Sequence, residues 1–334
     1  MYILDWIMVP IQIIIFLFTV YYFLIGVNGL WRKKEKKILT PQKTFAVIVA
    51  AHNESAVIGQ LVDNLKMLDY PKELYDIFVI ADNCTDNTAQ IARDCGAIVH
   101  ERFNDKERGK GFAMEWMFAR LFEMKRKYDA VAIFDADNLV DKRFLLEMNN
   151  RLCKGDKLVQ GYLDAKNPYD TWVSGTFAIA FWVIDHIWHL AKTNIGLSSV
   201  LGGTGMCITT DVLKKHGWGA TCLVEDMEFT MKSLAEGIKT TWAHDAIVYD
   251  EKPLTFKQSK RWAQGQFDVA HRFIPKMLKE GIRRRDIRIL DGCLHLLQPH
   301  FLLISTFFVI LSYVQMGLGY PLFTNIYQFL PSSL

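Results

Sequence analysis

The stretch Ala130–Asn138, AVAIFDADN, joins an unbroken apolar run to two carboxylates, Asp135 and Asp137. An apolar run of this length predicts a β-strand that is buried on both faces. Carboxylates at the carboxyl end of such a strand lie where open α/β sheets bind their ligands. Spaced two residues apart, they suit a hard cation, and a cation suits a diphosphate. Two solvated acids in a turn explain this pattern equally well, so the rest of the chain decides between the two interpretations.

Strand and helix patterns alternate around this stretch, which predicts an α/β sheet. Strands are expected at Phe45–Ala51, Ile77–Ala81, Ala97–His100, Ala130–Asp135 and Leu158–Tyr162. Helices are expected at Ala56–Leu68, Thr88–Cys95, Gly111–Tyr128, Val224–Ala235 and Phe256–Phe267, and a glycine-rich turn at Leu201–Met206. The alternation places the two acids inside one large α/β domain.

The composition excludes several classes of protein. With 39 basic and 36 acidic residues, the chain has no overall charge that would favour nucleic acid. Its six cysteines are scattered without CxxC spacing, which argues against a disulfide framework or a zinc site and suits a reducing compartment. Hydrophobic residues make up 51% of the 334 residues, and the surplus is concentrated at the two ends.

Both ends of the chain predict membrane spans. Residues Ile7–Leu30 carry no charge, and a second apolar run covers Cys293–Leu318; about 20 such residues cross a bilayer as a helix. Basic clusters lie beside both runs, at Arg32–Lys37 and Arg283–Arg288, on the sides that face the intervening domain. Because such clusters stay on the cytoplasmic side, the sequence predicts a multi-pass protein of the cell membrane with a cytoplasmic domain.

The predicted organisation therefore has four parts. They are an N-terminal transmembrane helix at 1–31, an α/β domain at 40–255, interfacial helices at 256–290 and a C-terminal transmembrane region at 291–334. Within the domain, Thr171–Ala191 is apolar and aromatic but is interrupted by Asp185, so an interfacial or core-packed helix is expected there. His186 and His189 in this helix are weak candidates for a metal pair.

A series of short elements, in this order, resembles the family 2 inverting glycosyltransferases, and most closely the membrane-bound cellulose, chitin, hyaluronan and poly-N-acetylglucosamine synthases. The elements are Ala51-His52-Asn53-Glu54, Asp82 with Asp86, Gly109-Lys110-Gly111, Asp135 with Asp137, Gly203-Thr204-Gly205, Glu225-Asp226, and the Q-x-x-R-W set Gln258, Arg261 and Trp262. The resemblance covers Phe45 to about Arg272. The chain departs from the pattern at Cys84, where serine is usual, and at Val224, where threonine or glutamate is usual.

The resemblance implies a GT-A nucleotide-sugar domain and a role for each matched residue. By resemblance, the donor nucleotide sugar is bound by His52, Glu54, Asp82, Lys110, Asp135, Gln258 and Arg261, and Asp135 and Asp137 hold the diphosphate through Mg²⁺ or Mn²⁺. The acceptor is positioned by Trp262, Gly203 and Thr204, and the catalytic pair is Asp226, as general base, with Glu225.

Elementary chemistry is consistent with these roles. A nucleoside diphosphate leaves readily once a cation neutralises its growing charge, so the reaction needs no general acid. One carboxylate then suffices to take the proton of the acceptor hydroxyl, and Asp226 is the candidate. The flat face of Trp262 suits the C–H face of a sugar, and the fork of Arg261 suits phosphate oxygens.

The leading hypothesis is transfer of a hexose or N-acetylhexosamine from a UDP-sugar to a growing β-linked glycan. Two spans cannot enclose a glycan channel, so either several copies in a homo-oligomer or a channel-forming partner supply it, or the product is short or lipid-linked. A second hypothesis is transfer to a polyprenyl phosphate or a glycolipid. A third is a phosphatase with an aspartyl nucleophile. A fourth is a non-catalytic sugar-binding membrane subunit, which would be expected to have lost Asp226 or one acid of the Asp135–Asp137 pair.

Overall fold

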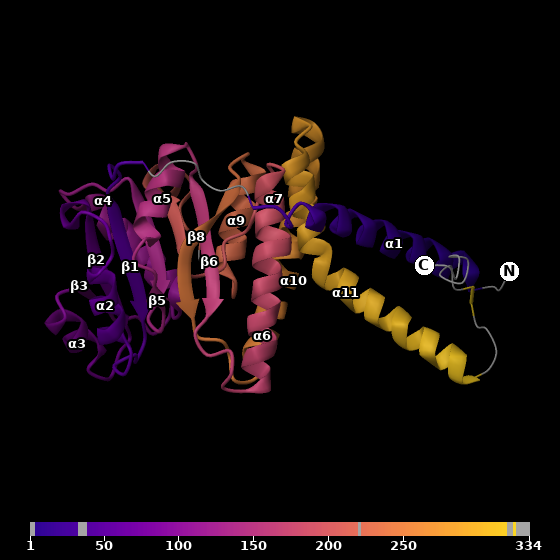
Figure 1. Cartoon of the computed structure of the whole chain (residues 1–334), viewed down its shortest axis with the longest axis horizontal. Coiled ribbons are helices and arrows are strands. Elements are labelled where there is room, and N and C mark those ends of the chain that lie inside the picture. Colours follow the sequence, from indigo (N-terminus) through magenta and orange to yellow (C-terminus); the bar gives the residue numbers. More distant parts are fainter. Residues whose placement is uncertain (1–3, 33–38, 220–221, 319–322, 325–334) are drawn as a thin grey trace.

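The computed structural model describes residues 4–32, 39–219, 222–318 and 323–324. Most of the first predicted basic cluster, at 33–37, and the end of the predicted C-terminal transmembrane region, at 325–334, lie outside the described residues. The strands are β1 (Phe45–Ala51), β2 (Tyr75–Asp82), β3 (Ile98–Arg102), β4 (Ala130–Asp135), β5 (Leu139–Val140), β6 (Leu158–Ala165), β7 (Met206–Thr209) and β8 (Thr240–Asp250). They form one eight-stranded mixed sheet (Figure 1).

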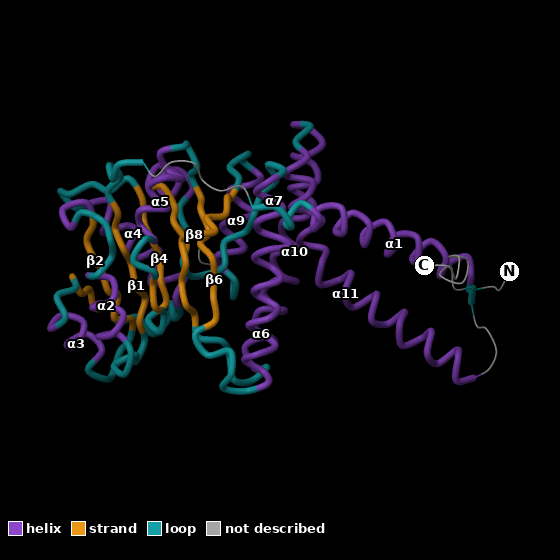
Figure 2. Tube along the Cα trace, viewed as in Figure 1, coloured by secondary structure: helices purple, strands orange, loops and turns teal. Residues whose placement is uncertain are grey.

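Helices connect the strands and extend beyond them (Figure 2). They are α1 (Asp5–Val27), α2 (Ile58–Lys66), η1 (Lys72–Leu74), α3 (Thr88–Asp94), α4 (Lys110–Glu123), α5 (Phe144–Cys153), α6 (Trp172–Val183), the π-helical segment η2 (Ile184–Leu190), α7 (Ala191–Asn194), α8 (Thr210–His216), α9 (Glu225–Ala235), α10 (Lys257–Arg284) and α11 (Ile287–Leu318). The helix expected at Gly111–Tyr128 ends early, at Glu123, where Lys127 donates hydrogen bonds to the carbonyls of Phe122 and Met124.

The sheet order is β3-β2-β1-β4-β7-β6-β8-β5, with β3, β2, β1 and β4 parallel and β7 antiparallel to both of its neighbours. The chain runs from β1 outward to β3 and then returns to the other side of β1 as β4. This reversal opens a crevice at the carboxyl ends of β1 and β4, which is where such sheets bind ligands. The predicted α/β sheet is confirmed, although β5, β7 and β8 were not predicted.

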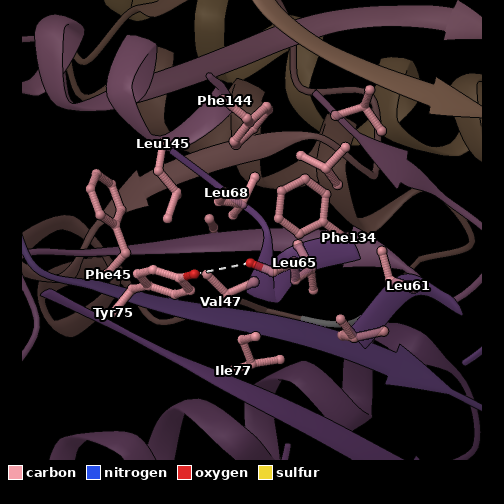
Figure 3. Packing of buried hydrophobic residues seen from close by; sticks show 14 of the residues in the cluster. Phe45, Val47, Leu61, Leu65, Leu68, Tyr75, Ile77, Phe134, Phe144 and Leu145 are labelled. Carbon is pink, nitrogen blue, oxygen red and sulfur yellow. Dashed lines mark hydrogen bonds between the residues drawn. The ribbon is translucent and has the colours of Figure 1, made fainter. Parts of the chain in front are cut away.

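Strand β1 is buried on both faces, so its alternate residues enter two separate cores. Phe45 and Val47 pack on one face with side chains of α2 and α5, and Figure 3 shows this cluster. Ala46 and Ile48 face the opposite core, which contains α4. The hydroxyl of Tyr75 donates to the carbonyl of Leu65 at 3.0 Å and so satisfies a polar group at the end of α2. The sheet edge that carries the acids therefore rests on a core filled from both sides.

Helices α1 and α11 leave the same side of the domain and diverge (Figure 1). Each is long and apolar enough to cross a membrane. They meet the domain at a buried ion pair, in which Lys192 Nζ of α7 lies 2.8 Å from Asp291 Oδ2 of α11. Tyr21 of α1 donates to the other carboxylate oxygen at 2.7 Å. The Asp291 carboxylate of α11 thus contacts both α1 and α7.

Replacing one member of this pair should destabilise the protein, because the other charge stays buried without compensation. We expect Asp291→Leu to lower the free energy of unfolding by about 3–5 kcal/mol and the double variant Lys192→Met/Asp291→Leu to recover most of that loss. Lys157→Met is the control, since the exposed Lys157–Asp211 pair contributes about 0–1 kcal/mol. The free energy of unfolding is measured in detergent for the native full chain and for the three variants. A double variant no more stable than Asp291→Leu would contradict the expectation.

Candidate active site

A cavity of about 490 Å³ lies at the carboxyl ends of β1 and β4. A second cavity of about 370 Å³ adjoins it, and both are lined by Ala50 and Lys110. The larger cavity contains most of the predicted site residues: Glu54, Lys110, Asp135, Asp137, Gly203, Thr204, Glu225, Asp226, Gln258, Arg261 and Trp262. The smaller contains His52 and Asp82. The structure therefore brings all of the predicted site residues to one edge of the sheet.

The smaller cavity is built from turns that follow β1 and β2. Asn53 and Asn83 adopt left-handed backbone conformations, with φ of 57° and 51°, which asparagine tolerates better than most residues. The ring Nδ1 of His52 lies 2.7 Å from the main-chain carbonyl of Asp82. The carboxylate of Asp82 accepts a hydrogen bond from the buried guanidinium of Arg102 at 2.6 Å. Arg102 thus fixes the acid at the base of this cavity, a role that the sequence did not suggest.

Lys110 joins the two cavities. Its ammonium group donates to the Asp135 carboxylate and, at 2.8 Å, to the carbonyl of Gly203. Burial alone would lower the pKa of Lys110, but the charges of Asp135, Glu225 and Asp226 outweigh it, so the pKa lies above its ordinary value. The lysine therefore stays protonated and offsets part of the negative charge of the larger cavity.

Asp137 has an environment suited to a cation. Burial, followed by the charges of Asp250, Asp135 and Glu251, raises the pKa of Asp137 to about 7. Within the described residues, no three histidine, cysteine or acidic side chains form a complete ligand set. Mg²⁺ and Mn²⁺ ordinarily complete their coordination with phosphate oxygens and water, so the Asp135–Asp137 pair fits an ion that arrives with a diphosphate.

Asp226 lies on the floor of the larger cavity, in the first turn of α9. Burial, followed by the charge of Glu225, raises the pKa of Asp226 to about 7, although Lys110 acts in the opposite direction. The turn at Gly203 passes directly over this carboxylate. Gly203 has φ +82°, and a Cβ there would come within 3.3 Å of Asp226 Oδ2. The glycine thus leaves the carboxylate open to the cavity.

Helix α10 supplies the opposite wall. Gln258, Arg261 and Trp262 lie on one face of it, as their spacing predicts, and all line the cavity. The ring of Trp262 meets that of Phe177 from α6 edge-on at 5.9 Å. Val224, which departs from the family pattern, packs against Gly265: a Cβ on that glycine would lie 2.7 Å from Val224 Cγ2. Valine here fills the space left by a glycine on α10.

Thr204 lines the larger cavity and also supports the turn that carries the two acids. Its buried hydroxyl donates to Asn138 Oδ1 and accepts, at 3.1 Å, from the main-chain N–H of Asp135. Asn138 also donates to Asp250 Oδ1 at 3.0 Å. This network holds the turn that carries the two acids in one conformation.

The residues that sequence reasoning missed are Arg102, Asn138, Asp250 and Glu251. Asn138 directly follows the two acids, so its position was a usable signal. Asp250 ends β8 and Glu251 follows it; this strand was itself not predicted, and nothing in the local sequence marks the two acids. His186 and His189 lie outside both cavities: His186 Nδ1 is 3.1 Å from the Trp182 carbonyl, and His189 Nδ1 contacts the Ser199 hydroxyl.

The sequence profile of "Glycosyltransferase like family 2" matches residues 41–265, which is more than half of the chain. The chain belongs to this family. The match includes every predicted site residue, from His52 to Trp262, and it ends within α10.

Three curated relatives are each 25% identical to the chain. They are a "probable glycosyltransferase YdaM" of Bacillus subtilis (75% of this chain, 60% of the relative), a "beta-monoglucosyldiacylglycerol synthase" of Nostoc (71% and 52%) and a "poly-beta-1,6-N-acetyl-D-glucosamine synthase" of Staphylococcus epidermidis (75% and 61%). The chain thus spans about half to three fifths of the length of these relatives.

Two solved structures share the fold. A mannosyltransferase from Pyrobaculum calidifontis, in complex with GDP-Man and Mn²⁺, has a TM-score of 0.58 at 17% identity, over 87% of this chain and 81% of its own. TarS from S. aureus, in complex with UDP-GlcNAc, has a TM-score of 0.56 at 17% identity, over 77% and 72%. The predicted GT-A fold is confirmed.

Neutralising Asp137 should stabilise the metal-free protein. The pKa of about 7 in the folded protein exceeds the ordinary value of about 3.9, so ionising this carboxyl costs folding free energy as pH rises from about 4 to 7, and the cost is constant above. With EDTA at pH 8, we expect Asp137→Asn to raise the melting temperature, by an effect of up to about 4 kcal/mol. With Mn²⁺, the native chain should gain stability and the variant should gain less. Equal responses to Mn²⁺ would argue against a metal role for Asp137.

Proposed function

We propose that this protein is an inverting glycosyltransferase that moves a sugar from a nucleotide donor to an acceptor hydroxyl at the cytoplasmic face of a membrane. The observation that carries the proposal is the meeting, in one cavity, of Asp226, the Asp135–Asp137 pair and Arg261. Family membership favours this function over a phosphatase. The retention of all three acids favours it over a non-catalytic subunit.

The donor is assigned to both cavities. Its base and ribose would occupy the smaller cavity beside His52 and Asp82, and its diphosphate would lie near Lys110 and Arg261 in the larger. A UDP-linked hexose or N-acetylhexosamine is the proposed donor. Asp135 and Asp137 would hold Mg²⁺ or Mn²⁺, which supplies positive charge to the departing diphosphate. Arg261 adds a planar set of donors for phosphate oxygens.

The chemical step is a single displacement. The acceptor oxygen forms a bond to sugar C1 as the bond from C1 to the phosphate oxygen breaks, and its electron pair leaves with the nucleoside diphosphate. The hydroxyl proton passes to the carboxylate of Asp226, for which a pKa of about 7 is well matched to neutral pH. Glu225 helps to keep this pKa high. Trp262 would hold the sugar ring of the donor or the acceptor against its face.

Two classes of acceptor, a glycan and a lipid, are consistent with the sequence. A growing β-linked glycan is favoured by the resemblance to polysaccharide synthases and by the relative from Staphylococcus epidermidis. A lipid is favoured by the relative from Nostoc, whose name specifies a diacylglycerol product. A long polymer would also need a channel from further copies or a partner, because the described residues contain two candidate spans.

Removing the proposed base should abolish transfer and spare donor binding. We expect Asp226→Asn to lower kcat by about 10²–10⁴-fold, because the acceptor hydroxyl then loses its proton acceptor. The measurement is release of nucleoside diphosphate by the full chain, with Mn²⁺ and a panel of nucleotide sugars, alongside donor affinity by calorimetry. Asp211→Asn, an exposed acid outside both cavities, is the control. Full activity in Asp226→Asn would overturn its assignment.

Acidity should inhibit the enzyme in two separable ways. The profile of kcat/KM should fall as pH drops below about 7, because Asp226 becomes protonated and Asp137 loses its cation. Protons compete with metal at Asp137, so more Mn²⁺ should shift that part of the acid limb to lower pH. The part due to Asp226 should stay in place. An acid limb that disappears entirely at high Mn²⁺ would mean that Asp226 does not limit the rate near pH 7.

A further inference from the structure

A third cavity, of about 280 Å³, lies on the membrane side of the active site. It shares Val200, Met227 and Gln266 with the larger active-site cavity, and Met227 directly follows the proposed base. The two cavities are therefore neighbours with three wall residues in common, and the third cavity lies beside the residue that follows Asp226.

The walls of this third cavity are mostly hydrocarbon. Val183, Ile184 and Ile187 line one side, and Leu296 and Pro299 of α11 line another. Apolar walls disfavour a glycan, because each sugar hydroxyl that lost its hydrogen bonds to water there would cost free energy. They favour an alkyl or prenyl chain, which gains about 0.8 kcal/mol for each CH₂ that it buries.

Two buried polar groups in the lining lack partners. Within the described residues, the Nε1 atom of Trp188 and the Nδ1 atom of His295 have no hydrogen-bond partner. Buried polar atoms are ordinarily paired, so such groups in a cavity wall indicate a ligand or water with polar atoms. The indole N–H suits an ester or ether oxygen, as found where the hydrocarbon chain of a lipid joins its head group.

The cavity is also continuous with an exposed apolar surface. Val183, Ile184 and Ile187, which line it, remain 48%, 42% and 43% exposed. Ile179 and Trp172, on the same helical segment, are 59% and 74% exposed. This segment lies beside the point where α1 and α11 leave the domain (Figure 1). A face of this kind suits a position at the bilayer interface.

From this continuity we infer that the acceptor is a membrane lipid, whose hydrocarbon chain occupies the third cavity and whose head-group hydroxyl reaches Asp226. The inference rests on the proposed function and names its acceptor class. The lipid enters from the bilayer between η2 and α11. Its hydroxyl oxygen forms the new bond to sugar C1, its proton passes to Asp226, and the nucleoside diphosphate leaves with the electron pair of the broken bond. A glycolipid is the product.

The first experiment fills the cavity without touching the catalytic residues. Ile184→Trp is the test variant and Ile179→Trp the matched control, because both positions are exposed on one helical segment and Ile184 alone of the two lines the cavity. The full chain in nanodiscs receives UDP-glucose or UDP-N-acetylglucosamine with Mn²⁺. The acceptor probes are methyl, octyl and dodecyl β-glucoside, and dioleoylglycerol in the nanodisc bilayer.

For the native chain, kcat/KM should rise with alkyl length. Ile184→Trp should reduce kcat/KM for the dodecyl acceptor or dioleoylglycerol by roughly tenfold, the effect of about two methylene groups losing their buried environment. Its activity with the methyl glucoside and its affinity for the donor should match those of Ile179→Trp. Equal use of methyl and dodecyl acceptors, or equal losses in both variants, would overturn the lipid assignment while leaving the transferase intact.

A second experiment needs no turnover. A diacylglycerol with a diazirine in one acyl chain is photolysed with the full chain in nanodiscs, and the labelled peptides are mapped by mass spectrometry. Label at 183–188 and 295–299, reduced in Ile184→Trp, supports the lipid site. Label confined to α1 and the distal part of α11 would overturn it. If the cavity is labelled but the donor neither binds nor turns over, the lipid site is supported and the proposed transferase function is contradicted.

Discussion

Negative charge at the carboxyl ends of the central strands is the constraint around which this protein is arranged. Asp135 ends β4 and Asp137 follows it, Asp226 lies in the first turn of α9, and Asp250 ends β8, so separate parts of the fold place like charges in one cavity. Lys110 offsets part of that charge through Asp135. Burial, together with the remaining negative charge, raises the pKa values of Asp137 and Asp226, which suits the first to a cation and the second to proton transfer.

The larger active-site cavity has a polar cavity on one side and an apolar cavity on the other. On the side of β1 and β2 it continues into a polar pocket, where buried Arg102 holds Asp82. On the side of α11 it continues into an apolar cavity. In the proposed reaction, the nucleotide would therefore bind on the polar side and the hydrocarbon chain of the acceptor on the apolar side. Helix α10 contributes to both cavities: Arg261 lines the charged one, and Gln266 lines both.

Local patterns were sufficient to predict much of the parallel half of the sheet. Strands β1 and β4 are continuous apolar runs, and burial on both faces leaves few other interpretations of such runs. Strands β7 and β8 were missed, because a mixed sequence such as Thr240–Asp250 becomes a strand through its pairing with β6. Such pairing is a long-range contact, so no local pattern reports it. The acids after β8 were missed for the same reason.

The amino-acid sequence by itself determined the family, the α/β class and the identities of the proposed catalytic and donor-binding residues. These residues belong to short motifs at strand ends and on one helix face, and such motifs can be recognised without knowledge of long-range contacts. Tertiary structure alone decided which of these residues share a cavity, that Thr204 supports the Asp135 turn, and that Val224 packs on Gly265. It also decided that an apolar cavity lies beside the active site, since Ile184, Val200 and Leu296 are unremarkable hydrophobic residues in sequence and come together only through the packing of three distant segments.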